Sequence, residues 1–169
     1  MNPNLSLIPG DLGLFQLVAD RDLFTPALLP YADGYTIALL DCPPTLGVVS
    51  SQALMTSDRI LIPILGEPAA LKGLSEAVQL IRNDRPAVPI DVLRCRYRNQ
   101  LILTKQSNAI LEQGSQELGY QLMTTIIPEN VAVSEAMGPQ IPVSQYAPKS
   151  AGTTAYKQLA KECLKVWYE

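Results

Sequence analysis

Asp41 is the side chain whose surroundings point most directly to chemistry. It closes the apolar run 35–41 and is followed by a cysteine and two prolines. The run is continuous and contains β-branched and aromatic residues, so it predicts a buried strand of a parallel sheet, where ligands bind at the carboxyl ends of strands. A carboxylate at that end can hold Mg²⁺ through water beside nucleotide phosphates, and the prolines set the direction of the outgoing loop. In a structural alternative, Asp41 caps the helix expected over 46–58.

A second candidate is the basic cluster formed by Arg94, Arg96 and Arg98, which alternate with a cysteine and a tyrosine. In a strand this spacing puts the guanidinium groups on one face. A buried parallel strand does not tolerate that face, so we expect the strand to leave the sheet near Leu93. The cluster is then either a phosphate patch for DNA or nucleotide, or a solvated strand end paired with Asp91 or with glutamates.

The elements that must position these residues alternate along the chain. Apolar runs predict strands, and periodic segments predict helices. The pattern is that of an α/β fold: a three-layer, mostly parallel sheet with helices on both faces. We expect one domain over residues 1–169, with no linker dividing it. The predicted strands are 5–8, 35–41, 59–65, 88–97 and 120–128, and the predicted helices are 22–34, 46–58, 67–84, 102–118 and 153–168.

Composition removes several classes of function. The net charge is −3, so no global positive field draws the chain to nucleic acid, and any DNA contact must be local. The 3 cysteines are far apart and there is no histidine, which argues against zinc and suggests reduced thiols in a cytoplasmic protein. We expect no signal peptide, and no segment reaches the roughly 20 apolar residues of a membrane span.

The segment 35–81 resembles the ParA family of deviant-Walker partition ATPases, whose Walker B strand ends in Asp-Cys-Pro-Pro. Segments 4–14, 126–136 and 142–164 resemble the family's strand before Walker B, its nucleotide-pocket segment, and its closing loop and helix. The tetrapeptide Asp-Cys-Pro-Pro also distinguishes the chain from the related MinD group, in which other residues follow the Walker B aspartate. Proteins of that group end in a membrane-targeting helix. In 153–168 we expect a face turned to the core instead, with no membrane partner. Its predicted members are Tyr156, Leu159, Ala160, Cys163, Leu164 and Trp167.

The resemblance implies ATP and Mg²⁺ as cofactors, a self-dimer that sandwiches ATP, a ParB-type partner, and DNA bound without sequence preference. Asp41 would be the Walker B residue that holds Mg²⁺ through water, and Pro128 and Asn130 would lie near the adenine. Without the family, the segment that holds the latter two is simply a strand end with a turn. Glu129 and Ala132 stand where the family carries basic residues, which argues against DNA binding. The implied location is a bacterial cytoplasm, on the nucleoid if DNA is bound.

The family's phosphate-binding loop has no counterpart here. No Gly-Lys-Ser/Thr occurs in the sequence, and residues 10–13 (Gly-Asp-Leu-Gly) have neither the lysine nor the length. The fold is therefore expected to be of the deviant-Walker P-loop type but to lack its N-terminal strands, its P-loop and the catalytic aspartate. We expect no catalytic residue in this chain, little or no ATP hydrolysis by the chain alone, and an open sheet edge at 35–41.

Three hypotheses follow. The first is the C-terminal portion of a Mg-ATP-dependent segregation ATPase of plasmids or chromosomes. The second is a non-catalytic ParA-like module or remnant that binds and modulates a complete ParA-type ATPase or a ParB-type partner. The third is an unrelated α/β binding protein that carries Asp-Cys-Pro-Pro by chance.

Overall fold

The structure is a computed structural model that describes residues 4–11, 13–14, 22–45, 47–98, 100 and 102–168. The chain divides into two compact units at the boundary between Asp58 and Arg59. Each unit is described by itself.

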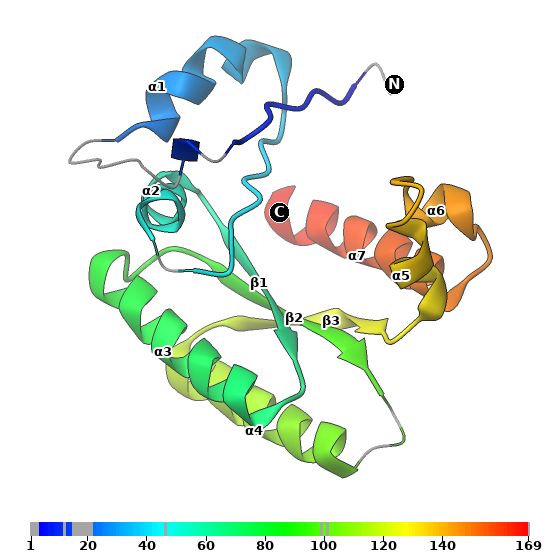
Figure 1. Cartoon of the computed structure of the whole chain (residues 1–169). Helices are drawn as coiled ribbons and strands as arrows, with labels where there is room; N and C mark the ends of the chain where they lie inside the picture. The colour runs from blue at the N-terminus through cyan, green and yellow to red at the C-terminus, as the bar shows by residue number, and fades with distance from the viewer. Residues whose placement is uncertain are drawn as a thin grey trace. The chain divides into compact units, whose positions relative to one another are not determined.

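The second unit is built on a parallel sheet of three strands (Figure 1). They are β1 (Ile60–Leu65), β2 (Ile90–Tyr97) and β3 (Gln121–Pro128), in the spatial order β1-β2-β3. Parallel neighbours need a crossover, and helices supply it: α3 (Pro68–Asp84) joins β1 to β2, and α4 (Ile102–Leu118) joins β2 to β3. All three strands were predicted from their apolar runs.

Helices cover both faces of this sheet, as predicted. Figure 1 shows α3 and α4 on one face and α7 (Ala151–Tyr168) on the other, with α5 (Val131–Ala136) and α6 (Val143–Tyr146) beside the start of α7. The short α6 lies where the sequence predicted only loop. None of the described helices has the length and apolar character that a membrane span requires.

The helix α3 forms where its sequence predicts it. Pro68 occupies the first turn, where its missing N–H costs nothing, and the helix buries Leu74, Val78 and Ile81 at helical spacing. On the opposite face of the sheet, Leu93 and Met123 belong to a core that also contains Ile127, Ala155 and Cys163.

Pro63 lies inside β1 without interrupting its pairing with β2. The register of β1 against β2 continues through Pro63↔Leu93 to Leu65↔Cys95. Ile60 donates its N–H to Pro89 at 3.0 Å, so residues 60, 62 and 64 direct their backbone groups to β2. Pro63 therefore falls on the other edge of β1, where no described strand needs its N–H.

The buried face of α7 is rotated from the predicted one. Ala155 and Cys163 are buried and Leu159 and Trp167 pack against the same core, in agreement with part of the prediction. The other predicted members, Tyr156, Ala160 and Leu164, are exposed. The helix thus has two apolar rows, and the sequence could not tell which of them meets the sheet.

The first unit contains α1 (Phe24–Leu28), the 3-10 helix η2 (Leu29–Gly34) and α2 (Val48–Thr56). The strands predicted at 5–8 and 35–41 are wrong: neither run is a strand, and Leu39 is 78% exposed. An apolar run becomes a strand only where its backbone N–H and C=O groups find a neighbouring strand. The described residues of this unit contain no strand that could pair with either run.

Candidate functional site

Asp41 is exposed, lies in a segment without regular secondary structure and does not end a sheet strand. The loop after it is held by α2, because the buried Ser50 donates its Oγ–H to the carbonyl oxygen of Thr45 at 2.6 Å. The capping alternative is wrong: the N-cap of α2 is Gly47, and no side chain caps it. Asp41 is therefore an exposed carboxylate ahead of a loop that Ser50 holds in place.

The carboxyl end of the sheet carries a charged cluster in the second unit. Glu129 accepts a hydrogen bond from Arg96 at 3.3 Å and from Arg98, whose Nη2 is 2.8 Å away. The bond from Arg98 is the main reason that the pKa of Glu129 lies below its ordinary value, and Glu129 in turn raises the pKa of Arg98. Two cations share this carboxylate, and Glu67 adds a second negative charge close enough to raise the pKa of Arg98 further.

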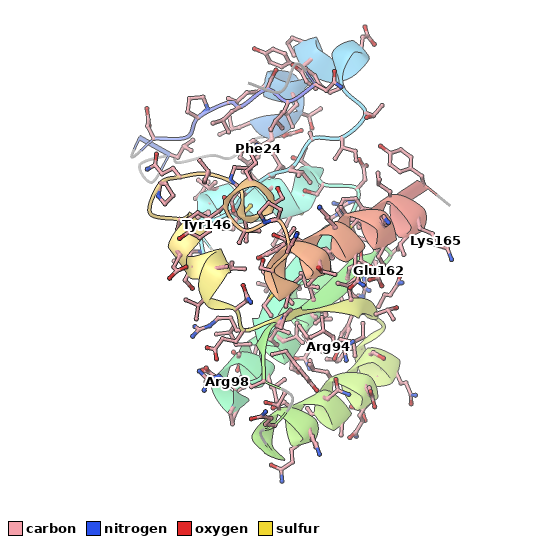
Figure 2. The ribbon with its side chains drawn as sticks, turned by 90° about the vertical axis from the view of Figure 1, so that its right-hand side faces the viewer. Phe24, Arg94, Arg98, Tyr146, Glu162 and Lys165 are labelled. Atoms are coloured by element: carbon pink, nitrogen blue, oxygen red, sulfur yellow. The ribbon has the colours of Figure 1, made fainter. Side chains whose placement is uncertain are left out.

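Arg94 is separated from this cluster, although the sequence predicted all three arginines on one face. It donates Nη1–H to Asn108 of α4 and Nη2–H to the carbonyl oxygen of Met123 at 2.7 Å. Arg96 has a left-handed backbone with φ of 50°, which interrupts the alternation of side chains. Figure 2 shows Arg94 and Arg98 at different places along the sheet. The predicted departure near Leu93 is also wrong, because β2 stays paired to Tyr97.

Arg94 instead serves a bulge in β3. Val92 pairs with Leu122 but Arg94 pairs with Ile126, so β3 has two extra residues between these pairs. Glu162 of α7 accepts the freed N–H groups of Thr124 and Thr125 at 2.6 and 2.7 Å. Burial raises the pKa of Glu162, but the hydrogen bonds from these threonines outweigh it and the pKa is lowered from 4.5. The bulge is thus held from both sides of the sheet.

Pro128 and Asn130 flank Glu129 at the end of β3. Pro128 pairs with Tyr97, and Asn130 is the N-cap of α5 but makes no capping bond. The Oδ1 atom of Asn130 is buried and has no hydrogen-bond partner among the described residues. A Cβ on Gly152 would lie 3.1 Å from it. It would also lie 2.5 Å from Val133 Cγ2, so glycine at 152 lets α7 pack closely against α5 beside this unpaired acceptor.

These residues fit one end of a nucleotide only. An amino group such as that of adenine could donate to Asn130. For the triphosphate, the sequence has no Gly-Lys-Ser/Thr, and in the described part of the chain no group of acidic, cysteine or histidine residues could hold a metal ion. The hydrogen-bonding capacity of Asn130 thus suits a base, while the sequence offers no Gly-Lys-Ser/Thr loop for phosphates.

The sequence analysis did not predict the ion pair between Arg59 and the buried Asp91 of β2, which lies on the side of the sheet that α7 covers. Asp91 is fully buried and accepts bonds from Arg59 Nη1 to both carboxylate oxygens at 3.1 Å, and from Trp167 Nε1 at 3.0 Å. Arg59 also donates to the carbonyl oxygen of Val166 at 3.3 Å. A lone aspartate inside an apolar strand was the available signal, since such a charge must be paired.

A parallel sheet covered by helices on both faces defines an α/β fold, and this fold is consistent with a P-loop NTPase-like domain. Comparison with known proteins is more specific. The AAA domain family matches residues 1–88. The chromosome-partitioning ATPase Soj of Treponema pallidum is 30% identical over 94% of the chain and 66% of its own length. The chromosome partitioning protein ParA of Caulobacter vibrioides is 34% identical, over 96% of the chain and 65% of its own length.

The chain belongs to this family of AAA domains, in its ParA/Soj-like group, as its residues 35–81 had indicated. An uncharacterized protein of Pseudomonas putida is 33% identical, and the chain spans 62% of the length of that relative.

Proposed function

We propose that this chain is the C-terminal, base-side portion of a Mg-ATP-dependent partition ATPase that segregates chromosomes or plasmids in the bacterial cytoplasm. One observation carries the proposal: proteins described as partitioning ATPases align with 94–96% of the chain, while the sequence holds no phosphate-binding lysine loop. Asp41 takes the Walker B role, holding Mg²⁺ through water, and Pro128 and Asn130 take the base. A ParB-type partner and a self-dimer belong to the same proposal.

We expect the purified chain to release no phosphate from Mg-ATP beyond the rate of the Asp41→Ala variant. A carboxylate without a donor nest and a lysine cannot neutralise the transferred phosphoryl group. The measurement is a phosphate-release assay, with calorimetry of ATP binding on both proteins. Micromolar ATP binding that disappears in Asp41→Ala would contradict the missing cradle, because another set of donors would then hold the phosphates.

DNA contact, if the chain makes it, depends on Arg96 and Arg98, which Glu129 neutralises in part. We expect Glu129→Gln to strengthen binding to random-sequence duplex DNA, because it frees both guanidinium groups. The slope of log K against log[salt] should become steeper by the equivalent of roughly 1–2 phosphate contacts. Fluorescence anisotropy at several salt concentrations measures this. The control is Glu129→Gln with Arg98→Ala. Equal binding by the wild type, Glu129→Gln and the control would show that these arginines do not contact DNA.

A second candidate function, a non-catalytic module that binds a complete ParA-type ATPase, is favoured by the outer edge of β1. Leu61, Pro63 and Leu65 direct their backbone groups to that edge, where no described strand pairs with them. Such edges associate with other chains. Adding the chain to a complete ParA-type ATPase separates the two functions, since a module changes the partner's turnover and an inert portion does not.

A further inference from the structure

The helices α5, α6 and α7 line an open, mostly apolar groove on the second unit, with a volume of about 640 Å³. It contains no group that the proposed nucleotide site uses. We call it the α5–α7 groove; its apolar lining includes Val133, Met137, Ile141, Val143, Tyr156 and Ala160.

Large apolar side chains stand open at and beside this groove. Met137 is 76% exposed, and Tyr156 and Leu164 of α7 are 42% and 53% exposed. Tyr156, Ala160 and Leu164 form the second apolar row of α7, at intervals of one helical turn. An exposed row continuous with a groove is the form of surface that takes a partner helix, whose anchors repeat at the same spacing.

A row of lysines runs parallel to the apolar row. Lys157, Lys161 and Lys165 are all exposed, and Lys157 also lines the groove. None of them takes part in an ion pair with the described residues. Figure 2 shows Lys165 near the C-terminal end of α7, and Tyr146 of α6 near the other end. The positive row therefore borders the apolar row along the helix, and acidic Glu162 is turned to β3.

We propose that the α5–α7 groove and the exposed rows of α7 bind an amphipathic helix of a partner protein, with an apolar stripe flanked by glutamate or aspartate. The stripe fills the groove and covers Met137, Tyr156 and Leu164, while the acidic flank pairs with the lysines. This inference goes beyond the proposed function, since it needs neither ATP nor DNA.

Charge and shape favour this occupant over two others. In a symmetric pair of two copies of this face, the lysine rows would lie against each other and repel. A lipid surface can take the lysines and the apolar row, but it has no side chains at fixed helical spacing to occupy the open groove beside them. A helix of complementary charge can fill the groove, cover the apolar row and pair with the lysines.

The test uses a labelled synthetic helical peptide of about 18 residues, roughly five turns. Its leucines follow the i, i+3, i+4, i+7 pattern and its flanks are glutamate. A second peptide has lysine flanks, and a third keeps glutamate but has serine in place of leucine. We expect the full chain to bind the first peptide only, more weakly at high salt. Lys157→Glu with Lys161→Glu should weaken binding about tenfold or more. The exposed Lys105→Glu on α4, across the sheet, is the matched control and should change it by less than about twofold.

Methyl-labelled methionine locates the bound peptide by NMR. Among the 4 methionines, Met137 is exposed at the groove and Met123 is fully buried in the core. We expect the peptide to shift the Met137 resonance and to leave that of Met123 in place, with Met137→Leu identifying the signal.

Three results overturn the proposal. The first is binding to none of the peptides, or equal binding to the glutamate and lysine peptides. The second is binding to phosphatidylglycerol vesicles that the double lysine variant loses, without peptide binding, which assigns the surface to a membrane. The third is dimerisation in light scattering that Met137→Glu abolishes, which assigns the groove to a second copy.

Discussion

Replacing Asp91 by alanine is expected to lower the free energy of unfolding by about 3–5 kcal/mol. Asp91 is fully buried, and its removal leaves the charge of Arg59 and the indole N–H of Trp167 without their acceptor. Removing one partner of a buried pair costs more than the pair itself contributes, because the remaining charge, here that of the 26% exposed Arg59, stays partly desolvated without its counter-ion. The cost also spreads to α7, since Arg59 and Trp167 join that helix to β2 through Asp91.

The measurement is urea unfolding followed by circular dichroism and by the fluorescence of Trp167, the only tryptophan of the chain. Asp84→Ala is the matched control: that aspartate is exposed at the end of α3, and its loss should change stability by no more than about 0.5 kcal/mol. Asp91→Asn should lie between the two, because the amide oxygen still accepts one bond. Equal stability of Asp91→Ala and Asp84→Ala would show that the pair contributes nothing to the fold.

Periodicity and apolar runs were enough to predict the second unit. The strand at 59–65, the helix at 67–84 and the strand at 120–128 each lie close to the observed element. In each case, local pattern and tertiary environment agree, because the neighbours that bury the apolar residues are contiguous in the chain.

The predictions that were wrong have a common cause. The conformation of each segment depends on residues elsewhere in the chain that contact it, and a local sequence pattern does not show these residues. The run 35–41 has strand composition but no described strand beside it, so it does not form a strand. The sequence predicted Arg94 as part of a basic face. In the structure it donates a hydrogen bond to the carbonyl oxygen of Met123, in a bulge where β3 has two extra residues that the sequence did not predict. In the candidate site, Asp41 was predicted from its place after an apolar run, and Pro128 and Asn130 were predicted from the family resemblance. The role of Glu129 as counter-ion required the geometry.

Glu162→Gln is expected to reduce stability by about 1.5–3 kcal/mol at neutral pH, because hydrogen bonds to a charged acceptor are stronger than those to a neutral amide. The carboxylate is the acceptor of the N–H groups of Thr124 and Thr125 in the bulge of β3. The matched control is Glu76→Gln, which removes only the exposed pair with Lys72 at 3.7 Å and should cost about 0.5 kcal/mol or less.

The pH dependence distinguishes this role from simple packing. The pKa of Glu162 in the folded chain is lowered from 4.5, so its contribution is fully present above the unfolded pKa and is lost as the pH falls through the folded pKa. The wild type should therefore exceed Glu162→Gln by a constant margin near pH 7, and this margin should shrink as the pH falls below about 4.5. Urea unfolding of both proteins at a series of pH values measures the margin. A margin independent of pH would mean that Glu162 acts through its shape, and that the bulge does not require a charged acceptor.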